Sequence, residues 1–170
     1  MLDLIFIYRA EVQTYGALIL CLAMLRWGGG PERAVALTWL IGIEAVDWVY
    51  HAISGANYVL ESIDPFHAAL DVAVAIAFVI IALYANRLYP LVIAAFQLLS
   101  ATSHLTRELV ESITPIAYAV MVFAPSWGIL VAMILGFARH LRRRKEFGDY
   151  RGWRGQPPFF LGRLCPSPAS

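Results

Sequence analysis

Residues 44–71 read EAVDWVYHAISGANYVLESIDPFHAALD and connect two strongly apolar segments of the chain. The stretch concentrates ionisable side chains, which are Glu44, Asp47, His51, Glu61, Asp64, His67 and Asp71. Ionisable groups near hydrocarbon are costly unless they have a partner, water or a function. We therefore expect the fold, and any functional site, to be organised around this turn.

The composition indicates a membrane protein. Of the 170 residues, 60% are hydrophobic and only 15% are charged, and the mean hydropathy is +0.66. A soluble domain usually carries about a quarter of charged residues. The excess apolar surface needs lipid to cover it, so the sequence predicts an all-α integral membrane protein.

The apolar residues fall into five segments, each close to the length of about 20 residues that a helix needs to cross a bilayer. These segments are residues 4–26, 34–54, 65–84, 90–109 and 115–138. The glycines and proline of residues 28–31 cannot continue a helix, and Asp64 before Pro65 is a typical helix start. The sequence thus predicts a five-helix transmembrane bundle over residues 1–138, followed by a polybasic, Gly/Pro-rich tail over residues 139–170.

The first and fifth segments depart from a regular apolar helix. Arg9, Glu11 and Gln13 lie in the first segment, which leaves an alternative of four spans plus an interfacial N-terminal segment. Asp3 stands where a signal peptide would be positive, so we expect this segment to be retained. Pro125 lies inside the fifth segment and should kink it, freeing a backbone carbonyl that a neighbouring helix must satisfy.

The basic residues predict the orientation. A basic run at residues 139–145 places the C-terminus in the cytoplasm, and five spans then place the N-terminus outside. We expect a multi-pass protein of the bacterial inner (plasma) membrane. The basic run should attract anionic lipid by about 1 kcal/mol per residue. The tail beyond it should be mostly disordered, and nucleic acid is not an expected partner.

Polar side chains form one stripe on each of three consecutive predicted helices. The second helix carries Glu44, Asp47, Trp48 and His51; the third carries His67 and Asp71; the fourth carries Gln97, Ser100, His104, Glu108 and Glu111. The alternating directions of the helices bring the histidines to the same depth in the outer leaflet. We therefore expect one intramembrane pocket that contains Asp47, His51, His67, Asp71 and His104.

The third helix also carries a row of small residues, Ala69, Ala73 and Ala77, roughly opposite Asp71. Rows of this kind allow helix backbones to approach closely. We therefore expect this helix to be central and to pack closely through the alanines.

The excess of carboxylates over nearby fixed positive charges, Arg9 and Arg107, favours a cation in the pocket. Imidazoles with carboxylates suit a divalent transition metal such as zinc or iron. They equally suit a proton relay, because desolvation raises carboxylate pKa values. The predicted metal ligands are His51, His67, Asp71 and His104, supported by Glu44, Asp47, Glu108 and Ser100. A purely structural role would contribute only about 0.6 kcal/mol per hydrogen bond.

Two short motifs resemble the metal-binding motifs of membrane-protein families, although neither assigns the chain to a family. His67-x-x-x-Asp71 resembles the transmembrane metal-binding pair of cation diffusion facilitators, which have six spans and a cytoplasmic domain. Ser100-x-x-x-His104 with Asp71 is similar to the alkaline ceramidase and adiponectin-receptor superfamily of zinc membrane hydrolases. That superfamily has seven spans and a late HxxxH pair, which this sequence lacks.

Three functions follow from these observations. The first is a small polytopic inner-membrane protein whose outer-leaflet His/Asp/Glu pocket binds or relays a cation, either a metal ion or a proton. The second, of equal weight, is a non-catalytic accessory subunit or assembly factor of a larger membrane complex. The third is a metal-dependent membrane hydrolase.

Overall fold

The computed structural model describes residues 2–54, 65–109, 115–148 and 150–155. Within these ranges the regular secondary structure is helical, and an isolated β-bridge joins Ala85 to Trp153. The helices are α1 (Leu2–Trp27), α2 (Gly30–Thr38), the π-helix η1 (Trp39–Ala45), α3 (Val46–Ser54), α4 (Pro65–Tyr84), α5 (Tyr89–Leu109) and α6 (Pro115–Phe147). The predicted all-α class is confirmed.

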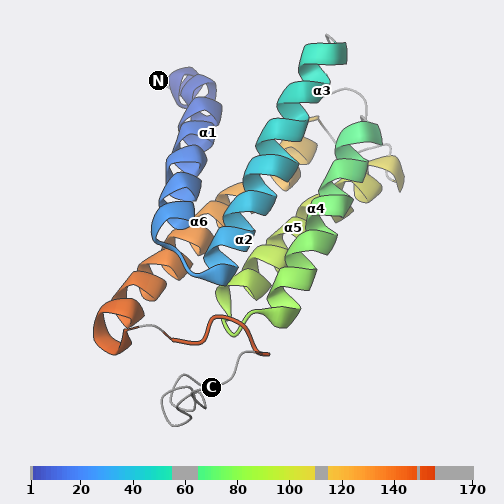
Figure 1. The fold of residues 1–170 in the computed structure, drawn as a ribbon. Coiled ribbons are helices and arrows are strands. Elements are labelled where there is room, and N and C mark those ends of the chain that lie inside the picture. The colour runs from blue at the N-terminus through green and yellow to red at the C-terminus, as the bar shows by residue number, and fades with distance from the viewer. Residues whose placement is uncertain (1, 55–64, 110–114, 149, 156–170) are drawn as a thin grey trace, which may run out of the picture.

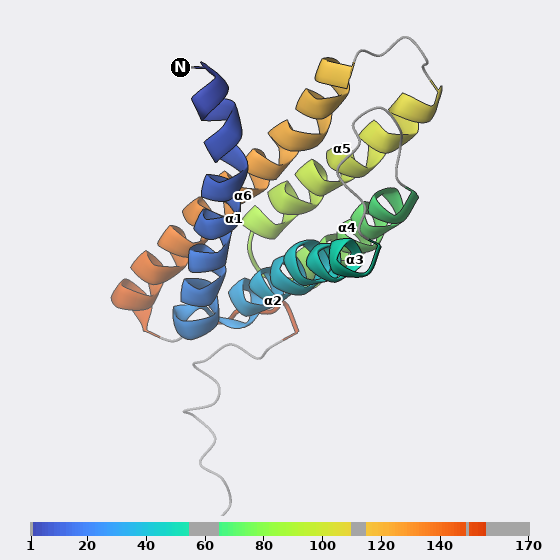
Figure 2. The ribbon, with the colours of Figure 1, turned by 90° about the horizontal axis from the view of Figure 1, so that it is seen from above.

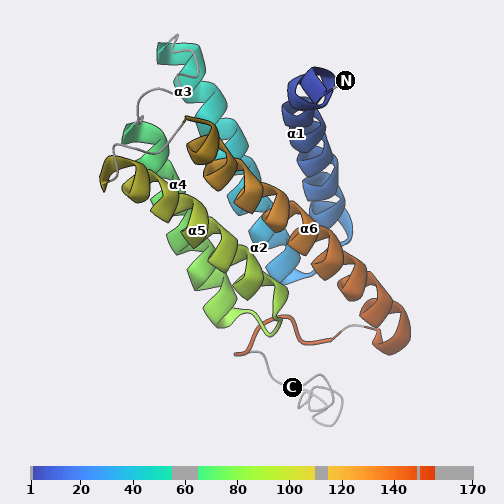
Figure 3. The same cartoon turned by 180° about the vertical axis from the view of Figure 1, so that it is seen from behind.

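The helices run alternately down and up, with α2, η1 and α3 forming one continuous rod (Figure 1). The rod packs on α1 and α4, α4 packs on α5, and α5 packs on α6. Contacts between α1 and α6 close the ring of helices, as the views from above and from behind show (Figures 2 and 3). The helix α4, which we expected to be central, contacts both the rod and α5.

The π-helix η1 changes which residues share a face of the rod. Its i, i+5 geometry brings the indole N–H of Trp39 to 3.2 Å from Oε1 of Glu44, to which it donates a hydrogen bond. Glu44 is therefore satisfied within its own helix. Trp48, which we expected on the same face as Asp47, is 72% exposed. A π-helical segment inside a helix often marks a functional site.

Close helix packing occurs on α6 and not on the alanine row of α4. Ala69 and Ala73 are exposed, so the expected packing through that row is wrong. A Cβ atom added at Gly128 would lie 2.7 Å from the ring of Phe96, and one at Gly136 would overlap the ring of Tyr89. The two glycines thus let α5 lie directly against α6, because the aromatic rings occupy the space that side chains would need.

The five predicted apolar segments all form helices, but five spans are confirmed only in part. Within the described residues, α4 and the part of α6 from Ala124 to Phe147 are long and apolar enough to cross a membrane. The segment Tyr89–Ser103 is a shorter apolar helix. In the most apolar stretch of α4, only 22% of the residues are buried within the bundle.

The C-terminal tail is more ordered than expected. The helix α6 continues past Ala138 through the basic run to Phe147. Residues 150–155 then return along the lower end of the bundle, where the N–H of Asn86 donates to the carbonyl of Gly152 at 3.0 Å. The prediction of disorder is wrong for these residues, because pairing with the α4–α5 turn satisfies their backbone. Residues 156–170 lie outside the described ranges.

The carbonyl freed by Pro125 lies against a hydroxyl group of the neighbouring helix. Proline has no N–H to donate to the carbonyl of Met121, four residues earlier. The hydroxyl of Ser103 on α5 is buried and lies 2.9 Å from the carbonyl oxygen of Leu99 in its own helix and 3.2 Å from that of Met121. Because the hydroxyl has a single proton to share between the two carbonyls, Ser103 replaces the missing backbone donor only in part.

This arrangement makes a testable prediction about stability. Replacing Ser103 with Ala should lower the free energy of unfolding in detergent by about 1 kcal/mol, the typical net contribution of one hydrogen bond. The same replacement in a Pro125→Ala background should cost much less, because an alanine at that position supplies its own N–H to the carbonyl of Met121. Equal losses in the two backgrounds, measured by thermal unfolding, would show that Ser103 does not serve this carbonyl.

Candidate metal centre

Three of the predicted site residues meet at the upper end of the bundle. Asp47 and His51 lie one turn apart on α3, and His67 lies in the first turn of α4. Oδ1 of Asp47 is 2.7 Å from Nε2 of His67 and 3.6 Å from Nε2 of His51. One potential ligand atom from each residue lies within 4.8 Å of the others. We call Asp47, His51 and His67 the histidine cluster.

Aromatic packing beside the histidine cluster positions its two helices. The rings of Tyr50 on α3 and Phe66 on α4 are stacked, with centroids 3.9 Å apart and an interplanar angle of 7°. These residues directly precede His51 and His67, whose rings are 5.3 Å apart. Since Pro65 begins α4 in a conformation suited to a first helical turn, the sequence itself places His67 next to this contact.

Asp71, which we expected among the ligands, faces α5 instead. Its Oδ1 accepts a hydrogen bond from Nε2 of Gln97, and its Oδ2 accepts one from Oγ of Ser100, both at 3.0 Å. Gln97 and Ser100 are buried. The polar stripes of the third and fourth predicted helices therefore meet at Asp71, while those of the second and third meet at the histidine cluster.

Of the remaining predicted residues, Glu44 has its partner elsewhere. Glu44 is engaged by Trp39, as described above. His104 and Glu108 belong to α5, but their side chains lie outside the part of the chain that the structure describes. Among the described side chains, the residues expected in one pocket thus form two separate sites, the histidine cluster and the Asp71 site.

Protein-family models, curated proteins and solved structures give no match to this chain. The chemistry of the histidine cluster therefore follows from its own donor atoms. Two imidazole nitrogens and one carboxylate oxygen form a set that zinc accepts, with a fourth position left for water or another ligand. The same set is typical of non-haem iron sites. With metal bonds of about 2.0–2.2 Å, the ligand atoms of a tetrahedral site lie about 3.3–3.6 Å apart. The 3.6 Å between Asp47 and His51 matches this spacing, whereas Nε2 of His67 and Oδ1 of Asp47 form a hydrogen bond of 2.7 Å and would have to move apart to bind the same ion.

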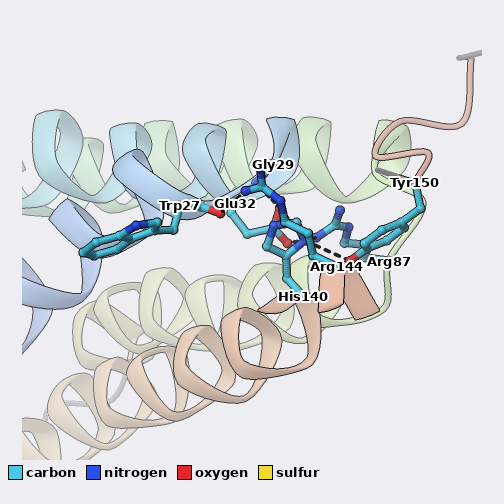
Figure 4. Close-up of polar contacts among 7 residues, drawn as sticks. All are labelled: Trp27, Gly29, Glu32, Arg87, His140, Arg144 and Tyr150. Atoms are coloured by element: carbon cyan, nitrogen blue, oxygen red, sulfur yellow. Dashed lines mark hydrogen bonds and ion pairs between the residues drawn. The ribbon is translucent and has the colours of Figure 1, made fainter. Parts of the chain in front are cut away.

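A second polar network, which the sequence did not predict, lies at the opposite end of the bundle, and Figure 4 shows its side chains. Glu32 in α2 is completely buried, and Nη1 of Arg87, in the α4–α5 turn, forms an ion pair with its Oε1. The N–H of Gly29 donates to Oε2 of Glu32 at 3.2 Å. Both carboxylate oxygens are therefore satisfied, as a buried charge requires.

His140, to which we assigned no role, belongs to this network. Its Nδ1 lies 3.0 Å from Nη1 of Arg87 and 2.9 Å from the hydroxyl of Tyr150. A guanidinium group can only donate, so the imidazole is the acceptor in its contact with Arg87. The guanidinium also lies over the ring of Tyr150, 4.9 Å from its centroid. The network thus joins α2, the α4–α5 turn, α6 and the C-terminal segment.

One local signal could have identified this network. Glu32 lies three residues after the helix-capping Gly29, a position at which an acid satisfies the first backbone donors of a helix. Nothing local could have paired it with Arg87 or His140, which come from distant parts of the chain.

Proposed function

We propose that this chain is a small polytopic membrane protein whose histidine cluster binds a divalent transition metal, zinc or iron, at the outer side of the membrane. The observation that carries the proposal is the convergence of three ligand atoms from two helices within 4.8 Å. The second predicted helix supplies Asp47 and His51, and the third supplies His67.

The exposed surface supports insertion of the bundle in a membrane. Large apolar side chains are exposed on every long helix, among them Leu22, Ile41, Val72, Ile76, Ile80, Leu83, Leu91, Leu99, Ile134 and Leu135. Soluble monomers rarely expose contiguous apolar patches of this kind. The helix α4 is apolar but mostly unburied, unlike the core helix of a soluble protein. Lipid is the environment that would cover this surface.

The distribution of arginine residues supports the predicted orientation, with the C-terminus in the cytoplasm. Arg26, Arg33, Arg87 and Arg144 lie at the lower end of the bundle, where α1, α4 and α6 end (Figure 1). Basic residues favour the cytoplasmic side. The histidine cluster, at the opposite end, would then face the outside of an inner membrane.

The donor set favours binding over catalysis. A metal-dependent hydrolase needs a general base beside a metal-bound water. Of the described carboxylates, Asp47 is itself in the donor set, while Asp71 and Glu44 are held by Gln97, Ser100 and Trp39. The proposal is therefore a metal-binding site, and a subunit role in a larger complex would be compatible with it.

The test is titration of the detergent-purified full chain with zinc and with ferrous iron, followed by elemental analysis. The wild-type protein should bind one metal ion per chain. His51→Ala and His67→Ala should each lose stoichiometric binding while remaining monodisperse. A wild-type protein that is folded but binds neither metal would contradict the proposal, as would retention of full binding by both variants.

A further inference from the structure

The lower end of the bundle contains a cavity that the proposed metal site does not use. Its volume is about 280 Å³, and it is lined by arginine, histidine, aromatic and glycine residues, including Arg33, Arg87, Arg144, His140, Tyr150 and Trp153. We call it the basic cavity. Small-molecule sites begin at about 300 Å³, so the basic cavity suits a compact group and not a large ligand.

The charge of the lining selects an anion. Arg33 comes from α2, Arg87 from the α4–α5 turn and Arg144 from α6, so three separate elements each contribute a guanidinium group. The buried carboxylate of Glu32 pairs with Arg87 and compensates one of these charges. Among the described residues at the cavity, the three guanidinium groups outnumber this carboxylate, which leaves a net positive charge. Guanidinium groups also match the oxygens of phosphate in a bidentate manner.

The neighbouring backbone and the C-terminal segment shape the basic cavity. The N-terminus of α2 begins at Gly30, beside the cavity, and its partial positive charge is already compensated by the carboxylate of Glu32. Trp153 packs directly over Gly30, where any Cβ atom would overlap the indole ring. The C-terminal segment thereby forms one wall of the basic cavity, and the missing side chain at residue 30 is what allows it to do so.

The position of the cavity favours a lipid headgroup as the source of the anion. Trp27 and Tyr84 lie at the same end and are 53% and 65% exposed. Exposed aromatic residues of this kind mark the level of lipid headgroups, and basic pockets on the cytoplasmic side of membrane bundles bind anionic headgroups. We propose that the basic cavity binds the phosphate of an anionic lipid of the cytoplasmic leaflet. This inference rests on the membrane insertion proposed above, but not on the metal site.

The experiment is native mass spectrometry of the detergent-purified full chain with phosphatidylglycerol, phosphatidylcholine or inorganic phosphate. Wild-type protein should retain phosphatidylglycerol preferentially. Arg33→Gln combined with Arg144→Gln should weaken this binding about tenfold or more, because charge-assisted hydrogen bonds are lost. The matched control, Arg142→Gln combined with Arg143→Gln, removes the same charge from α6 outside the cavity and should retain most of the binding.

Several results would overturn the inference. Equal weakening in both double variants would indicate attraction to the basic run as a whole. Equal retention of phosphatidylcholine would show that the cavity does not select an anion. Inorganic phosphate that displaces the lipid at comparable concentration would point to a soluble phosphate compound. Metal binding does not enter these measurements, and a protein that fractionates without membranes would contradict the proposed insertion first.

Discussion

Replacing Arg87 with Met is expected to lower the free energy of unfolding by about 3–5 kcal/mol, the usual cost of removing one partner of a buried ion pair. Methionine retains much of the volume of the side chain but leaves the carboxylate of Glu32 without its cation. Glu32 is completely buried, and its carboxylate would keep the N–H of Gly29 but lose its charged partner. The measurement is thermal or denaturant unfolding of the purified protein in detergent.

A second variant separates charge from packing. Adding Glu32→Gln to Arg87→Met removes the uncompensated charge, and replacing a whole buried pair by neutral groups is often close to neutral. The double variant should therefore be more stable than Arg87→Met alone. Arg142→Met, at an exposed position of α6, should change stability by no more than about 0.5 kcal/mol. Losses that simply add in the double variant would show that the pair is not coupled.

Zinc at about one hundred times its Kd is expected to stabilise the wild-type protein by about 2.7 kcal/mol, the linkage value for a ligand that binds only the folded state. The effect should arise because the histidine cluster takes ligands from both α3 and α4. Asp47→Asn should abolish most of the zinc-dependent stabilisation, since Asp47 lies within contact distance of both histidines. Thermal unfolding with zinc and with a chelator measures the difference.

Asp71→Asn is the matched control for this prediction. It makes the same chemical change one turn below His67, but at a carboxylate held by Gln97 and Ser100. Its basal stability should fall, because charge-assisted hydrogen bonds are weakened, while its response to zinc should persist. If Asp71→Asn lost the zinc response as completely as Asp47→Asn, the ligand set would be the one expected from spacing alone.

Helical spacing predicted that Asp71 would join His67 in one site, but the structure places them in two. His67 and Asp71 share a face of α4, as their separation of four residues predicts. That face is wide enough for His67 to contact the rod while Asp71 contacts α5. Spacing gives the direction of a side chain relative to its own helix, but the neighbour it meets depends on how the helices pack.

The amino-acid sequence alone determined the helical class, the start of α4 at Pro65, the pairs of residues that share a helix face, and the need for a donor near Pro125. These properties depend on local backbone geometry and on the cost of leaving polar groups unsatisfied in apolar surroundings. Only the tertiary structure decided that Glu32, Arg87 and His140 form one network, and that Asp71 is separate from the histidine cluster. Such contacts join distant parts of the chain, and the π-helical segment alters the register of one helix between them, so no periodicity in the sequence could specify them.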